Sequence, residues 1–73
     1  MKIRVDGLRT VAWEFEDTHS GSERYGRIMS ISWNAETLIL SIGYTDTSQD
    51  PTGTRVFSKY FQPNEYTKVV IEP

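Results

Sequence analysis

Apolar and polar residues alternate along most of this chain. Over residues 25–33, Met29, Ile31 and Trp33 share one side of an extended strand, with serines between them. Over residues 38–44 the same alternation places four residues on one side: Leu38, Leu40, Ile42 and Tyr44. A period of two is typical of strands that bury one face, and turn residues separate the alternating segments. The pattern therefore predicts an antiparallel β protein.

These two segments form a predicted hairpin with a four-residue loop over residues 34–37. The loop pairs three sets of apolar positions: Trp33 with Leu38, Ile31 with Leu40, and Met29 with Ile42. Residues directly opposite each other share a face of the sheet, so this loop length agrees with both alternation patterns. We expect this apolar face to belong to the core, with Trp13 packed against it.

A second hairpin is predicted at the C-terminal end, where residues 55–62 and 66–72 flank a turn with Pro63 at its second position. An even loop pairs Phe61 with Tyr66, Lys59 with Lys68, Phe57 with Val70, and Arg55 with Glu72. The opposite side carries no charge and is the expected core face, with Val56, Ser58, Tyr60, Val69 and Ile71. The spacing of the rings also fits a short helix over residues 55–62, although the neighbouring β-branched residues favour a strand.

The remaining elements complete a five- or six-stranded antiparallel meander. Val11, Trp13 and Phe15 alternate with polar or small residues, and a shorter strand at Ile3–Val5 ends at the turn dipeptide of residues 6 and 7. Residues 17–24 and 45–53 read as polar loops. A curled sheet or a small SH3-like or OB-like barrel would protect the strand edges, and a flatter sheet that dimerises through a face or an edge is the alternative.

The length of the chain allows one domain, spanning residues 1–73. A domain of this size buries only about 60 % of its unfolded surface. The sequence has no cysteine, which removes disulfides and thiolate metal sites as sources of stability. Self-association is the remaining compensation besides efficient packing, so we expect a homo-oligomer that is at least a dimer.

The net charge and the hydropathy of the chain restrict the classes of partner that we expect. A net charge of −2 argues against binding duplex DNA through a broad basic face. No apolar run approaches the roughly 20 residues that span a bilayer, and the first residues lack the apolar stretch of a signal peptide. We therefore expect a cytoplasmic protein, of host or viral origin, without a membrane partner.

The sequence indicates no catalytic or metal site. Its single histidine, His19, lies beside Asp17 and Ser20, but neighbours in one loop rarely reach the geometry of a catalytic triad. The oxygen-bearing residues 46–50 resemble the start of a calcium loop, yet Pro51 and Phe57 stand where that loop needs glycine and glutamate. We expect no enzymatic activity, no metal and no cofactor.

One face of the C-terminal hairpin interleaves rings with cations, and we predict it as the binding face: Arg55, Phe57, Lys59, Phe61, Tyr66 and Lys68. Rings can stack on bases or fill a partner's pockets, while cations engage phosphates or carboxylates. The alternative is that the rings are core and the cationic stems lie along apolar surface. Because burying three cations would cost several kcal/mol each, we expect this face to meet solvent.

Three functions follow in order of preference. The first is a non-catalytic module that acts through protein–protein contact, as an adaptor, a subunit or a compact inhibitor of the sort phages deploy against host machinery. The second is a small barrel that binds single-stranded nucleic acid. The third is an oligomer that sequesters a small ligand, with a pocket built between subunits from Arg24, His19 and a secondary candidate pair, Arg27 and Tyr44.

Overall fold

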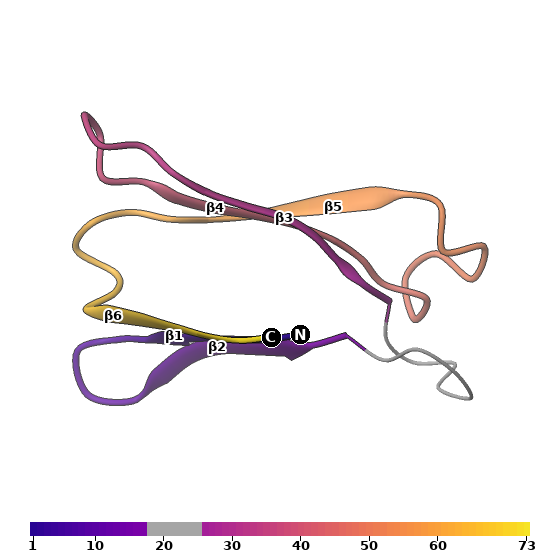
Figure 1. Cartoon of the computed structure of the whole chain (residues 1–73), viewed down its shortest axis with the longest axis horizontal. Helices are drawn as coiled ribbons and strands as arrows, with labels where there is room; N and C mark the ends of the chain where they lie inside the picture. Colours follow the sequence, from indigo (N-terminus) through magenta and orange to yellow (C-terminus); the bar gives the residue numbers. More distant parts are fainter. Residues whose placement is uncertain (18–25) are drawn as a thin grey trace.

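In a computed structural model, which describes residues 1–17 and 26–73, the described part of the chain is all β and holds six antiparallel strands (Figure 1). The strands are β1 (Lys2–Asp6), β2 (Val11–Glu16), β3 (Ile28–Trp33), β4 (Leu40–Thr45), β5 (Val56–Phe61) and β6 (Lys68–Glu72). They form two three-stranded sheets that lie face to face, with strand orders β2-β1-β6 and β3-β4-β5. The predicted all-β fold class is confirmed.

The first sheet, β2-β1-β6, has β1 in its centre. Ile3 lies opposite Phe15 and Val5 opposite Trp13, as the alternation predicted for β1 and β2 requires, but Val11 lies opposite Asp6 beyond a register shift and leaves its predicted face, 46 % exposed. The turn begins as the dipeptide at residues 6 and 7 indicates, with the Gly7 amide donating to the Thr10 carbonyl at 2.8 Å. On its other side β1 pairs with β6 along its whole length. The inner face of this sheet therefore carries six apolar residues: Ile3, Val5, Trp13, Phe15, Val69 and Ile71.

The second sheet, β3-β4-β5, is a meander. The loop of its first hairpin, between β3 and β4, is longer than the predicted loop of residues 34–37. Trp33 lies opposite Leu40, so residues 34–39 form the connection, and the predicted register is wrong by two residues. The loop closes on Asn34, whose amide donates to the Ile39 carbonyl at 3.1 Å, while Leu38 adopts a left-handed conformation with φ of 61°. A shift of two residues keeps every side chain on its predicted face.

Three residues nevertheless leave the predicted core of this hairpin, and one of them is Trp33, which ends β3 and is 56 % exposed. Met29 falls at the register shift between Ile28 and Ser30 and is 57 % exposed. Leu38 belongs to the loop and is exposed as well. Alternation cannot reveal a bulge, which inserts one residue into a strand and reverses the faces beyond it.

The core lies between the two sheets and draws on both. Its buried apolar cluster consists of Ile3, Val5, Leu40, Ile42 and Phe61. Trp13 and Tyr44 pack against this cluster from opposite sheets, with their ring centres 5.7 Å apart. The predicted contact of Trp13 with the β3–β4 hairpin is thus present.

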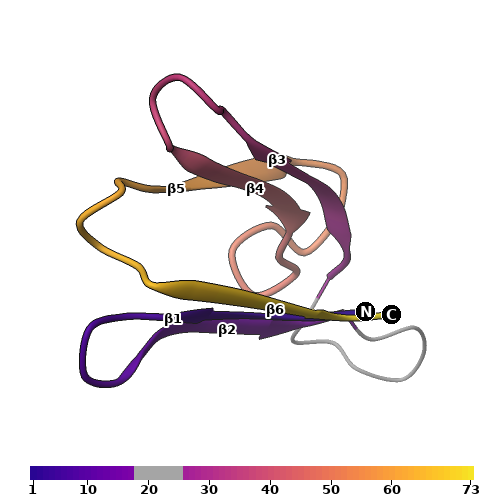
Figure 2. The ribbon, with the colours of Figure 1, turned by 60° about the vertical axis from the view of Figure 1, so that its left-hand side comes forward.

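The predicted C-terminal hairpin is wrong. Its turn forms, with the Glu65 amide donating to the Gln62 carbonyl at 2.9 Å, but the strands on either side belong to different sheets. β5 pairs with β4 and β6 pairs with β1, so residues 62–67 cross from one sheet to the other (Figures 1 and 2). The strand over β5 is confirmed against the helical alternative.

The faces of β5 are consequently the reverse of those predicted. Phe61 lies opposite the buried Leu40 and is itself 4 % exposed. Tyr60 points outward and is 61 % exposed. Each β5 face follows its neighbour β4, not β6, because residues directly opposite each other share a face. On β6 the predicted inner position of Val69 holds.

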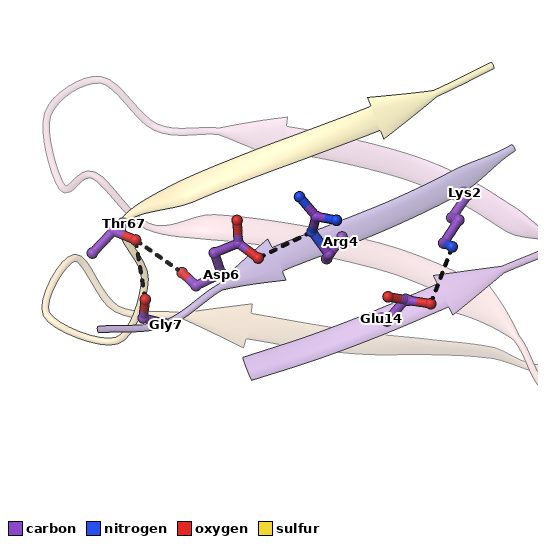
Figure 3. Close-up of polar contacts among 6 residues, drawn as sticks. All are labelled: Lys2, Arg4, Asp6, Gly7, Glu14 and Thr67. Atoms are coloured by element: carbon purple, nitrogen blue, oxygen red, sulfur yellow. Dashed lines mark hydrogen bonds and ion pairs between the residues drawn. The ribbon is translucent and has the colours of Figure 1, made fainter. Parts of the chain in front are cut away.

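The outer faces of the two sheets differ in charge. Strand register places seven charged residues on the outside of the first sheet: Lys2, Arg4, Asp6, Glu14, Glu16, Lys68 and Glu72. Lys2 forms an ion pair with Glu14 at 3.2 Å, and Arg4 with Asp6 at 3.1 Å (Figure 3). The outside of the second sheet carries no charge and consists of Ser30, Ser32, Ser41, Gly43, Thr45, Val56, Ser58 and Tyr60.

Candidate functional site

The candidate site is an apolar cleft on the side of the molecule where β3 and β6 are the outermost strands of their sheets. We call it the β3/β6 cleft. It encloses about 360 Å³ and is lined by Ile31, Ser32, Trp33, Leu40, Tyr66, Val69 and Ile71. Its volume falls in the range of ligand and side-chain pockets, roughly 300–1,000 Å³. No charged side chain is among its lining residues.

Trp33 stands at the mouth of this cleft and is held there by a hydrogen-bond relay. Its side chain is 56 % exposed, although the residue opposite, Leu40, is buried. The indole Nε1 donates to the Tyr66 hydroxyl at 2.9 Å, and that hydroxyl donates to the Leu38 carbonyl at 2.6 Å. The relay joins the end of β3, the β3–β4 loop and the β5–β6 connection.

The relay matters because it fixes a large exposed ring before any partner arrives. A tryptophan with one hydrogen-bonding atom and a large apolar face suits a surface that is partly wet and partly buried by a partner. Tryptophan and tyrosine are enriched at the energetic centres of protein interfaces. A ring that is already oriented also loses less conformational freedom on binding. The cleft can thus receive apolar side chains of a partner.

The six residues of the predicted binding face do not lie together. Phe57, Lys59 and Phe61 occupy the inner face of β5, on the side of the molecule away from β6. The Lys59 ammonium lies 5.8 Å from the ring centres of both Trp13 and Phe61. The expectation that this cation would turn its face to solvent is wrong, because the lysine stem lies among the rings while its ammonium rests on their faces.

The other three residues of that set are separate from one another. The Arg55 guanidinium lies 5.0 Å from the centre of the Phe57 ring. Lys68 begins β6 and lies opposite Asp6 on the charged outer face. Tyr66 alone among the six lines the β3/β6 cleft. Whether the remaining five contact a partner stays a prediction.

Arg27 and Tyr44, the secondary candidate pair, do not lie opposite each other across β3 and β4. Ile28 lies opposite Tyr44, while Arg27 pairs through its backbone with Thr45. The Arg27 amide donates to the Thr45 hydroxyl and the Thr45 amide donates to the Arg27 carbonyl, both at 2.8 Å. Tyr44 is half-buried, with its ring centre 5.1 Å from that of Phe15. The other members of this set, His19 and Arg24, lie outside the described residues.

The two acidic residues of the β4–β5 loop, Asp46 and Asp50, accept hydrogen bonds from nearby residues of the same loop. The Ser48 hydroxyl, and after it the Gln49 side chain, donate to Asp46 and lower the pKa of its carboxyl group. The Thr52 hydroxyl and the Arg55 amide act in the same way on the pKa of Asp50. Within residues 1–17 and 26–73, no three carboxylate or histidine side chains gather as a metal site requires. The same part of the chain has no helix long and apolar enough to cross a bilayer.

Sequence reasoning missed the cleft, although it singled out both of its aromatic residues. The alternation of Trp33 with Ile31 predicts a core position for the indole, and the predicted C-terminal hairpin places Tyr66 on its charged face. Their meeting depends on β6 lying beside β1, a pairing between the two ends of the chain. Alternation within a strand carries no information about which distant strand becomes its neighbour.

Comparison of the chain with protein-family models, with curated proteins and with solved structures finds no match.

Proposed function

We propose that this protein is a non-catalytic module that binds a protein partner through the β3/β6 cleft. The observation that carries the proposal is Trp33, a large apolar ring that is exposed and yet fixed by the relay through Tyr66 and Leu38. Apolar side chains of a partner would enter the cleft, and the indole face would cover them. Such a contact suits an adaptor, an assembly subunit or a compact inhibitor, including one of viral origin.

The alternative of a single-stranded nucleic acid has less support. Stacking on bases requires ring faces that are open to solvent, and cations beside them for the phosphates. Phe61 is buried in the core, while the faces of Phe57 and Trp13 lie beneath Arg55 and Lys59. In the part of the chain that the structure describes, none of the residues that line the cleft with Trp33 is a cation. These features favour an apolar protein surface as the ligand.

The proposal is tested with a photo-reactive amino acid placed at position 33 and, as a control, at position 60. Tyr60 is also an exposed ring, but it lies on the outer face of β5, away from the cleft. Irradiation in an extract of the source cell should crosslink a protein from position 33 and not from position 60. The crosslinked protein is then purified and its affinity measured directly.

With that purified partner, Trp33→Ala should weaken binding by about 30-fold, as expected for an interface residue worth roughly 2 kcal/mol. Trp33→Phe keeps a ring but loses the hydrogen bond to Tyr66. Its affinity for the partner should lie between that of Trp33→Ala and that of the wild type. Tyr60→Ala should bind as the wild type does. Circular dichroism verifies that each variant is folded. A partner that binds Trp33→Ala as tightly as the wild type would exclude the cleft as the contact site.

A further inference from the structure

We infer that the protein that occupies the β3/β6 cleft is a second copy of this chain, joined edge to edge through β3. This inference rests on the proposed function, because it names the partner of the same site. It follows from three features: the composition of the four edge strands, the direction of the free backbone groups of β3, and the distribution of charge on β6.

β3 lacks the usual protection of an edge strand. Proteins guard exposed edges with charged residues, proline or bulges, because a free edge pairs with another strand. Of the four edge strands, β2 carries two glutamates, β5 a lysine, and β6 a lysine and a glutamate. β3 has the sequence IMSISW, with no charge and no proline, and its one bulge lies at the far end from Trp33. The unprotected edge is the one that borders the cleft.

The free backbone groups of β3 lie beside the cleft as well. In an antiparallel pair, residues alternate between those that bond to the neighbouring strand and those that point away from it. The Asn34 amide bonds to Ile39 on the β4 side, so this alternation directs Ser32 toward β4. Ile31 and Trp33 then direct their amide and carbonyl groups outward. Both residues line the cleft, so a strand added here meets backbone partners and apolar side chains together.

A two-fold axis perpendicular to the sheets satisfies these groups. Centred on Ser32, it pairs Ile31 of one copy with Trp33 of the other and continues the second sheet across the dimer. The same axis brings the two β6 edges toward each other. β6 reads KVVIE, so antiparallel self-pairing about Val70 sets Lys68 of one copy against Glu72 of the other. Like-charge pairs are thereby avoided in both sheets.

The lining of the cleft agrees with this axis. On β3 the cleft is lined by residues 31–33, which are centred on Ser32, and on β6 by Val69 and Ile71, which flank Val70. The two centres therefore face each other across a single opening. In the dimer the two clefts join, and Trp33 and Ile71, both exposed in one copy, are covered by the other. The cleft is complete only when the second copy is present.

Placing charge at the proposed axis tests the dimer. Ser32→Lys sets two lysines directly opposite each other, while the matched variant Ser58→Lys places the same charge on the outer face of β5. By sedimentation equilibrium from micromolar to millimolar protein, the wild type should approach twice the 8.4 kDa chain mass. The dissociation constant should rise at least tenfold for Ser32→Lys and stay unchanged for Ser58→Lys. An equimolar mixture of Ser32→Lys and Ser32→Glu should dimerise again, because opposite charges then meet at the axis.

Crosslinking gives the register directly. The chain has no cysteine, so a single introduced thiol can pair only with its copy. Residues opposite each other in a non-hydrogen-bonded pair have Cα atoms about 4.5 Å apart, within disulfide range. Under mild oxidation Ser32→Cys should form a covalent dimer far faster than Ser58→Cys.

The outcomes separate this inference from the proposed function. A wild type that keeps the 8.4 kDa mass at millimolar concentration overturns the dimer. A dimer that Ser32→Lys leaves intact overturns the β3 edge as its interface. In either case the proposed function survives if position 33 still crosslinks a different protein and Trp33→Ala weakens the binding of that protein by about 30-fold. If crosslinking at position 33 captures a second copy of this chain and Ser32→Lys removes that product, the result supports both the dimer and the proposed binding role of the cleft.

Discussion

The two sheets share one core, but their outer faces differ in charge. The outside of β2-β1-β6 is charged at most positions, and its ion pairs include Lys2 with Glu14. The outside of β3-β4-β5 has small hydroxyl side chains, Gly43, and the exposed Tyr60 and Val56. The inner faces, by contrast, are equally apolar apart from Lys59. Charge keeps a surface from pairing with itself or with other proteins. Charge therefore guards the outside of the first sheet, whereas the outside of the second sheet relies on small polar side chains.

The difference also shows where the stability of so small a domain lies. Both sheets contribute fully buried residues to the core, Ile3 and Val5 from one and Ile42 from the other. Neither outer face adds comparable burial. Substitutions that reach the core should therefore lower the free energy of unfolding by similar amounts in either sheet, whereas substitutions on the outer faces should change it little.

The largest effect is expected at adjacent residues of β5. Phe61→Ala should lower the free energy of unfolding by about 3–5 kcal/mol, because it removes a buried ring and leaves a cavity. Tyr60→Ala, one residue away on the outer face, should change it by about 0.5 kcal/mol or less. Urea denaturation of the two variants measures the contrast. Equal losses, or a larger loss at Tyr60, would contradict the burial of Phe61 and favour the sequence-based prediction that Tyr60 faces the core.

A second pair of variants compares the two sheets directly. Ile3→Ala and Ile42→Ala each truncate a fully buried isoleucine at the centre of its sheet. Each should cost about 2–5 kcal/mol, and the two losses should agree within the scatter of such substitutions. Val56→Ala on the exposed face of β5 is the control. Loss of the β3-β4-β5 amide signals alone in the Ile42→Ala variant would show that the sheets fold independently.

The smallest effects concern pH and differ between the sheets. Bonds from the Ser48 and Thr52 hydroxyls lower the pKa values of Asp46 and Asp50 below 3.8, so the β4–β5 loop is stabilised above that pH and loses this contribution as pH falls through the lowered values. The hydrogen bond and charge of Glu14 raise the pKa of Lys2 above 10.5, so that contact is complete below pH 10.5 and is lost as pH rises through the raised value.

Both pH effects should be small because these side chains are solvent-exposed and screened. Amide chemical shifts followed across the pH range distinguish them: acid should move signals of the loop at residues 46–55, and alkali those around Lys2. Asp50→Asn should remove the acid transition at Thr52 and Arg55. An acid transition that persists unchanged in that variant would assign it to another group.

The parts of the fold that sequence predicts well are those fixed by neighbours along the chain. The turn after β1 forms at residues 6 and 7, as that dipeptide predicts, because its geometry depends only on adjacent residues. The loop before Leu40 was mispredicted because Leu38 is apolar and in phase with the strand, and only its left-handed backbone reveals a turn. Partner choice between distant strands is not encoded in alternation at all. For this reason the C-terminal hairpin was wrong, and the cleft that depends on the β1–β6 pairing was missed.

The β1–β6 pairing has a mechanical consequence. Lys2 lies opposite Glu72, so the two ends of the chain leave the first sheet side by side (Figure 2). A force that pulls these ends apart acts across the strands at one end of the pair and loads the backbone hydrogen bonds one after another. β6 would then separate from β1 one hydrogen bond at a time. This requires less force than a pulling geometry that loads all the hydrogen bonds at once. Peeling would carry Ile71 and then Val69 away from the β3/β6 cleft, so tension between the ends would open the cleft.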